Sequence, residues 1–154
     1  MNNFLTTKSF HQYSLISRIF VFFIVIPISF SHNAYSSELD NLFLKLKLSD
    51  NAVLARNYES KIWKIWLNSG SSDASNNQMQ IGLKLMENGQ LVHAQKVFEE
   101  ISIKDPNWAE SYNKIATIKF LKGDYSGSIN DIQKTLKLEP RHFGAISGLS
   151  LIHI

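Results

Sequence analysis

The chain has 154 residues, of which 44% are hydrophobic and 19% charged, and this length and composition fit one modest globular domain. It contains no cysteine, which excludes a disulfide framework, a thiol nucleophile and a lipidated cysteine anchor. The formal net charge is +3, and it falls to +1 without Lys8 and Arg18, which lie near the N-terminus. No block of like charges then remains, so the composition argues against nucleic-acid binding.

Residues 1–36 are predicted to be a secretory signal peptide. Lys8 and Arg18 precede an apolar run, "IFVFFIVIPISF", at residues 19–30, and no acidic residue occurs before Glu38. This order of a basic segment and an apolar segment is typical of export signals.

The apolar run is too short to span a bilayer, which takes roughly 20 residues, and Pro27 interrupts it. Small residues suitable for cleavage follow at residues 29–31 and 34–36, and we favour the second position. An uncleaved membrane anchor is the alternative. We therefore expect a periplasmic or secreted chain with no membrane span after cleavage.

Residues 37–74 predict a degenerate pair of helices followed by a linker. The pair is broken near residues 49–51, "SDN", and it lacks the Gly and Pro residues that punctuate the later sequence. We therefore expect it to cap a stack of more regular helix pairs. Its two apolar stripes at helical spacing are Leu39, Leu42, Phe43 and Leu46, and Ala55, Tyr58, Ile62 and Ile65.

Residues 75–142 repeat the same helix-breaking residues at an interval of 34 positions. Gly89 and Gly123 suit the left-handed residue that ends a helix. Pro106 and Pro140 prevent the following helix of each unit from continuing. Each unit is thus a helix, a turn and an antiparallel helix. Because one such pair cannot bury its own apolar stripe, the pairs must stack.

Two finer features of these units can also be predicted. Small residues, Gly82 and Ala116, occupy equivalent positions where the two helices of a unit must approach closely. The first helices are expected to open with capping boxes at residues 75–78 and 107–110.

The pattern resembles the tetratricopeptide repeat, whose 34-residue signature is W-x-x-L-G-x-x-Y, then A-x-x-x-F, then P. The matching residues are Gln78, Ile81, Gly82, Leu85, Ala94, Phe98 and Pro106 in the first unit, and Tyr112, Ile115, Ala116, Lys119, Ser128, Ile132 and Pro140 in the second.

This resemblance implies an all-α fold of stacked antiparallel helix pairs. It places full repeats at residues 75–108 and 109–142 and a partial third repeat at residues 143–154. Gln78 and Lys119 depart from the aromatic residues of the signature, so looser packing is expected there.

A second likeness joins two distant segments. The combination of Ile62-Trp63-x-x-Trp66 with residues 139–145, "EPRHFGA", is similar to one group of exported bacterial tetratricopeptide proteins. This resemblance would cover residues 38–154. Since that group largely lacks assigned activities, it informs the fold more than the function.

The last residues, "FGAISGLSLIHI", begin the first helix of a third unit and then stop. Phe143, Ile146 and Leu149 would face a second helix that does not follow. Repeat stacks need a terminal cap with a polar outer face. We favour a truncated gene product over an end that another subunit covers by self-association.

No pattern of residues indicates catalysis, a cofactor or a metal. His93, His142 and His153 lack the spacing of metal ligands, and His142 is expected to be solvated or to cap a helix. There is no phosphate loop, dinucleotide fingerprint or nucleophile elbow. The run "KIWKIW", residues 61–66, is interpreted as packing between repeats, with stacking on a ligand as the alternative.

The resemblance places the functional surface on the first helices, which line a concave groove that holds peptides or partner helices. Met79, Leu83, Met86 and Phe120 would form its apolar floor, and methionine adapts to varied partners. The alternative is that these side chains pack against the N-terminal helical pair. The inward-facing candidates are Asn76, Met79, Leu83, Met86, Glu87, Glu110, Asn113, Thr117 and Phe120.

The sequence therefore predicts a non-catalytic protein-interaction module that binds a peptide or partner helix, as an adaptor or assembly factor outside the cytoplasm. Two alternatives stay open. The repeats could precede an enzyme part lost by truncation, or the chain could be a structural protein that assembles with itself through its last helix.

Overall fold

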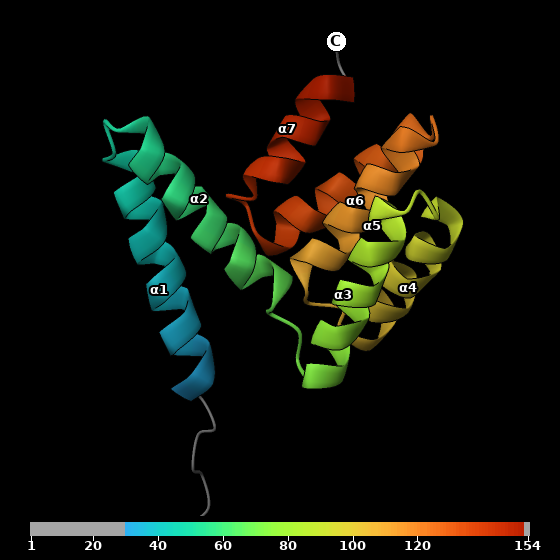
Figure 1. Cartoon of the computed structure of the whole chain (residues 1–154), viewed down its shortest axis with the longest axis horizontal. Coiled ribbons are helices and arrows are strands. Elements are labelled where there is room, and N and C mark those ends of the chain that lie inside the picture. Colours follow the sequence, from blue (N-terminus) through green and yellow to red (C-terminus); the bar gives the residue numbers. More distant parts are fainter. Residues whose placement is uncertain (1–29, 153–154) are drawn as a thin grey trace, which may run out of the picture. The chain divides into compact units, whose positions relative to one another are not determined.

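The structure, a computed structural model, describes the backbone of residues 30–152 and the side chains of residues 38–152. The chain divides into two units, Met1–Ser36 and Ser37–Ile154. Residues 1–29 of the predicted signal peptide lie outside the described part. Within that part the chain is all-α, with no strand, which confirms the predicted fold class (Figure 1). None of the described helices has the length and apolar character needed to cross a membrane.

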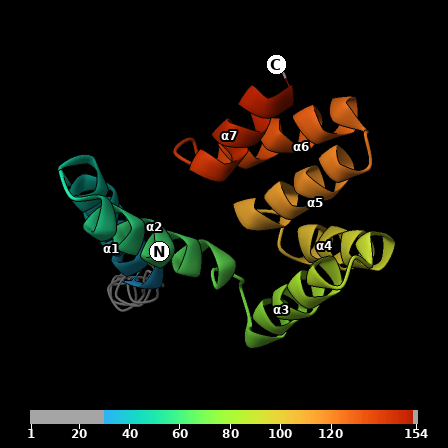
Figure 2. The ribbon, with the colours of Figure 1, turned by 45° about the horizontal axis from the view of Figure 1, so that its top comes forward.

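Seven helices follow one another in the described residues, and consecutive helices from α3 to α7 pack side by side (Figure 2). The helices α3 and α4 lie in the first predicted repeat, α5 and α6 in the second, and α7 in the predicted partial third. The bounds are α1 Phe30–Lys47, α2 Ala52–Leu67, α3 Asp73–Glu87, α4 Leu91–Lys104, α5 Ala109–Leu121, α6 Tyr125–Leu138 and α7 Phe143–Ile152.

The turns within the two repeats form as predicted. Gly89 and Gly123 have φ values of 72° and 79°, the left-handed conformation that glycine adopts without steric cost. At the first turn, the N–H of Gln90 donates to the carbonyl of Leu85 at 2.9 Å, which closes the end of α3. The second helices end at Lys104 and Leu138, just before each proline.

The predicted capping boxes are wrong. The helix α3 begins earlier, with Ser72 as its N-cap, and the Ser72 hydroxyl accepts from the N–H of Ser75 at 3.1 Å. The helix α5 is preceded by Trp108, which makes no side-chain cap hydrogen bond. Glu110 is turned into the protein and is fully buried, so it is not free to cap the helix.

The first repeat is held by a core in which Gly82 permits a close approach. A Cβ atom at Gly82 would lie 2.5 Å from the ring of Phe98, which is fully buried. In the second repeat, Ala116 is buried at the equivalent position, and the Ser128 hydroxyl donates to its carbonyl at 2.9 Å. The core cluster around this contact joins the first repeat to α5 and comprises Met79, Ala94, Phe98, Ile101, Trp108, Ile115 and Ile118.

The sequence predicts loose packing at Lys119, because this residue departs from the aromatic residue of the signature. The structure shows closer packing there. Its ammonium group lies 2.6 Å from the carboxylate of Asp131, which is buried on α6. Lys134 binds the other oxygen of the same carboxylate at 2.8 Å. A buried carboxylate is stable only with such partners, so an ion pair takes the place of the aromatic contact.

The α1–α2 pair forms its own cluster around Leu42, Ile62 and Trp66. The sequence predicts that this pair caps the stack of repeats. In the structure the C-terminal half of α2 contacts α5, His142 and the start of α7 through its aromatic side chains, and Leu67 at its end packs on the core of the first repeat.

We expect Gly82→Ala to lower the midpoint of thermal unfolding, because the added methyl group strikes the buried Phe98 ring. Overpacking of this kind costs about 1–3 kcal/mol, more than the roughly 1 kcal/mol that alanine gains in helix propensity. Gly148→Ala is the control, since its nearest neighbour, Ile132, lies at an ordinary 3.4 Å. Circular dichroism melts that show Gly82→Ala as stable as the wild type would contradict the close approach.

Candidate functional site

The nine residues predicted to line a groove lie on the first helices of the two repeats, five on α3 and four on α5. On α3, the Asn76 side chain accepts a hydrogen bond at 2.9 Å from the backbone of the preceding loop. Met79 is fully buried in the core. Leu83 and Met86 are half-buried against that core, and Glu87 is exposed. Leu83, Met86 and Glu87 therefore retain surface that a partner can reach.

On α5 the predicted residues divide into a buried and an accessible group. Glu110 and Asn113 are buried. Thr117 is exposed, and its hydroxyl donates to the carbonyl of Asn113 at 2.9 Å. Phe120 is half-buried, with its ring centroid 5.6 Å from that of Tyr125. A partner can thus reach the C-terminal half of α5.

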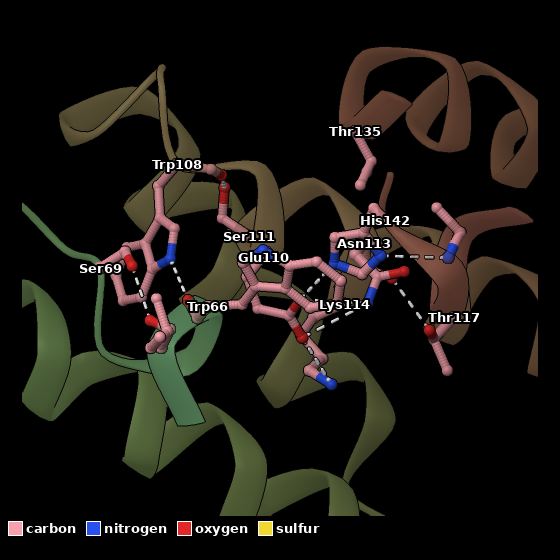
Figure 3. Close-up of polar contacts among 12 residues, drawn as sticks. Trp66, Ser69, Trp108, Glu110, Ser111, Asn113, Lys114, Thr117, Thr135 and His142 are labelled. Atoms are coloured by element: carbon pink, nitrogen blue, oxygen red, sulfur yellow. Dashed lines mark hydrogen bonds and ion pairs between the residues drawn. The ribbon is translucent and has the colours of Figure 1, made fainter. Parts of the chain in front are cut away.

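Glu110 is the centre of a buried polar cluster at the start of α5 (Figure 3). One of its oxygens lies 2.8 Å from Nε2 of His142, and the other lies 2.8 Å from the ammonium group of Lys114. The amide nitrogen of Asn113 lies 3.3 Å from both oxygens. Each carboxylate oxygen therefore has hydrogen-bonding partners despite complete burial.

The hydrogen bonds of His142 define its tautomer. Its Nδ1 accepts from the backbone N–H of Ala145 at 3.2 Å, so the ring proton lies on Nε2 and is donated to Glu110. The same contact caps the first turn of α7. The predicted role of His142 in capping a helix is thus confirmed, and the alternative of a solvated ring is wrong because the residue is fully buried.

Opposing effects act on the pKa of Glu110. Burial raises it, whereas the hydrogen bond from His142 and the positive charge of Lys114 lower it, and the net result is a pKa below the ordinary value of 4.5. Glu110 is therefore a carboxylate at neutral pH. Its negative charge lies inside the protein and is balanced by the ammonium group of Lys114.

Aromatic rings from α2 cover this cluster. The Trp66 ring stacks on the His142 ring with centroids 4.1 Å apart and planes 12° apart. Trp63 meets the edges of His142 and Phe143 at 5.5 Å and 5.2 Å. A Cβ atom at Gly144 would lie 2.6 Å from the Trp63 ring, so only glycine permits this approach.

Two further contacts join α2 to the start of α5. The indole N–H of Trp108 donates to the backbone carbonyl of Trp66 at 2.7 Å. The ammonium group of Lys114 lies 5.2 Å from the centroid of the Trp63 ring, within the range of a cation–π contact. The α2-docking site is defined here as Glu110, Lys114, His142, Phe143 and Gly144.

Sequence reasoning missed this site because it treated its two halves separately. Trp63 and Trp66 were correctly expected to pack between repeats, but His142 and Lys114 were given no part in that packing. The signal was present in the likeness to exported tetratricopeptide proteins, which joins the two tryptophans with residues 139–145. The structure brings those two segments into contact.

The polar side chains of this site are engaged with one another. Among the residues that the structure describes, no three His, Cys, Asp or Glu side chains are placed to hold a metal ion. Glu110 and His142 are enclosed, and their hydrogen bonds are directed at each other and at neighbouring groups. The geometry defines an all-α protein of paired helices with accessible side chains on α3 and α5.

Comparison with known proteins agrees with this class. A TPR repeat-containing protein of Rhizobium etli is 38% identical over 123 residues, which make up 78% of the chain and 60% of that protein. The chain thus spans 60% of the length of this curated relative. No family profile matches the chain, and no solved structure matches it. With its period of 34 residues and its helix pairs, the chain is a tetratricopeptide-repeat protein.

We expect Glu110→Gln to lower the free energy of unfolding at neutral pH by about 1–3 kcal/mol, because it weakens hydrogen bonds to a charged group. The folded-state pKa of Glu110 lies below 4.5, so its stabilising contribution is present above that pH and is lost as the pH falls toward the folded-state value. The difference between wild type and variant in the free energy of unfolding should therefore narrow as the pH falls below 4.5.

Urea unfolding at several pH values measures this difference. Glu100→Gln, at an exposed position of α4, is the control and should change the free energy by less than about 0.5 kcal/mol throughout. A Glu110→Gln penalty that stays constant or grows on acidification would rule out the stabilised carboxylate.

Proposed function

We propose that the chain binds a protein segment, an extended peptide or a helix, on the inner face that α3 and α5 present. Tetratricopeptide repeats are generally non-catalytic units that bind proteins, which supports this class of function. The observation that carries the proposal is the surface left accessible on these two helices. It comprises Leu83, Met86, Glu87, Thr117 and Phe120.

The chemistry of this surface suits a segment with apolar anchors. Leu83, Met86 and Phe120 offer apolar area, and methionine adapts to side chains of different shape. Glu87 and Thr117 add polar groups at the edge, which can set the register of a bound segment. Such a surface supports binding by contact alone, without catalysis or a cofactor.

The proposed setting is outside the cytoplasm, as an adaptor or assembly factor. The basic and apolar segments of residues 1–36 support export. After removal of the signal peptide we propose no attachment by a membrane span, and no nucleic-acid partner.

Self-association is the second candidate. Ile146 and Leu151 on α7 are 47% and 58% exposed, an apolar face that another copy could cover. Sedimentation velocity at rising concentration distinguishes the two candidates, since a mass that stays monomeric excludes self-association.

A peptide-display selection against the immobilised chain tests the primary proposal. Selected peptides should lose at least about tenfold in affinity, or 1.4 kcal/mol, for Phe120→Asp or Thr117→Arg, because these changes place a charge on the inner face. Met79 is unsuitable for this test since it is fully buried in the core.

Val92→Asp is the matched control, because Val92 is an exposed apolar residue on α4. It should leave affinities within about twofold. Peptides that bind all three variants as well as the wild type would place the binding surface elsewhere.

A further inference from the structure

Part of the inner face of α5 is already covered by another helix of the same chain. Glu110 and Asn113, two of the residues predicted to face a partner, are buried, and α2 contacts α5 beside them. The tetratricopeptide resemblance predicts that these first-helix positions face a bound segment. The helix α2 contacts α5 on that predicted face.

We propose that α2 is an intramolecular ligand of the α2-docking site, and that the external partner of this site is an amphipathic helix with two aromatic side chains three residues apart. This inference rests on the proposed function and names the class of partner for one half of the inner face. The partner would replace α2 rather than bind beside it.

The contacts of α2 define what such a partner must carry. Trp63 and Trp66 are three residues apart, so they lie on the same face of the helix. The second aromatic ring stacks on His142 at 4.1 Å, and the first lies between Lys114 and Phe143. A partner helix with this pair of rings would make the same stacking and cation–π contacts.

One polar atom of α2 has no hydrogen-bond partner at this site. The indole nitrogen of Trp66 is buried, and among the described residues it has no hydrogen-bond partner. An unpaired buried donor costs about 1–3 kcal/mol. A phenylalanine in a partner helix would stack on His142 without that cost, so α2 is not the best occupant that the site can have.

The connections of α2 also allow its release. Gly70 and Ser71 are fastened to the repeats by hydrogen bonds to Asn76 and Asp105, at 2.9 Å and 3.0 Å. Asn68 and Ser69, which precede them, are exposed. Rotation at these two residues would move α2 away while α3 stays in place.

Arg141 links α1 to the repeats. Its guanidinium lies 2.6 Å from the carboxylate of Asp40 and 4.3 Å from the centroid of the Phe43 ring. The Asp40 and Arg141 side chains are about half exposed, and exposed ion pairs contribute from about zero to 1 kcal/mol. The tryptophans of α2 add the stacked and T-shaped contacts with His142 and Phe143.

A helix tethered beside its site competes strongly with an external one. Short linkers give effective concentrations on the order of millimolar, so the apparent affinity of a partner is reduced while α2 is docked. Removing α2 from the α2-docking site should restore the affinity of the site for the partner.

The test uses the chain with both tryptophans replaced, Trp63→Ala and Trp66→Ala, and a labelled peptide with the sequence of residues 52–69. Fluorescence anisotropy should show saturable binding to this double variant, at least tenfold tighter than to the wild-type chain. A peptide in which both tryptophans are alanine should not bind, and His142→Ala added to the double variant should abolish binding.

Equal binding of the peptide to wild type and double variant, or binding of the alanine peptide, would overturn the inference. If the double variant does not fold, hydrogen exchange of the wild-type chain decides. The amides of α2 should then exchange faster than those of α4, because release of α2 leaves the repeats folded, and equally slow exchange would overturn the inference.

Failure of this inference can be distinguished from failure of the proposed function. Display peptides that depend on Phe120, together with equal binding of the residue 52–69 peptide to wild type and double variant, would keep protein binding and remove the role of α2. Loss of all peptide binding on the inner face would remove the proposed function itself.

Discussion

The buried carboxylate of Glu110 is the constraint on which the arrangement of the helices depends. A charge without contact with water must be surrounded by donors, and here they come from Lys114 on the same helix and from His142 on the turn before α7. That turn is thereby held against the start of α5. The flat ring of His142 then offers the surface on which Trp66 stacks. One charged group thus determines both how the third repeat begins and where α2 docks.

The repeats themselves could be predicted because their signals are local. Gly89 and Gly123 end helices through their own backbone conformation, and the prolines act on the helix that precedes them. The close helix approach at Gly82 was predictable from sequence because it involves only the neighbouring helix of the same repeat. The helix starts were harder, since Glu110 looks like a capping residue in sequence and is instead drawn into a buried cluster.

The position of α2 could not be predicted, since it depends on contacts between residues far apart in the sequence. Trp108 and Trp66 are 42 residues apart, and Glu110 and His142 are 32 residues apart. Helical periodicity shows that Trp66 belongs to an apolar face, but it does not show which surface that face covers. The candidate surface was therefore predicted in part: Thr117 and Phe120 are accessible, whereas Glu110 and Asn113 are buried.

The inner face consequently has an open half and a half that α2 covers. Whether a partner can reach the covered half depends on the strength of the interaction between Trp66 and His142. A double-mutant cycle with Trp66→Ala and His142→Ala measures that interaction directly by urea unfolding. The stacked pair predicts a coupling free energy of about 0.5–1.5 kcal/mol. Single-variant penalties that simply add, within about 0.3–0.5 kcal/mol, would show that the two rings do not interact and would contradict the docking of α2.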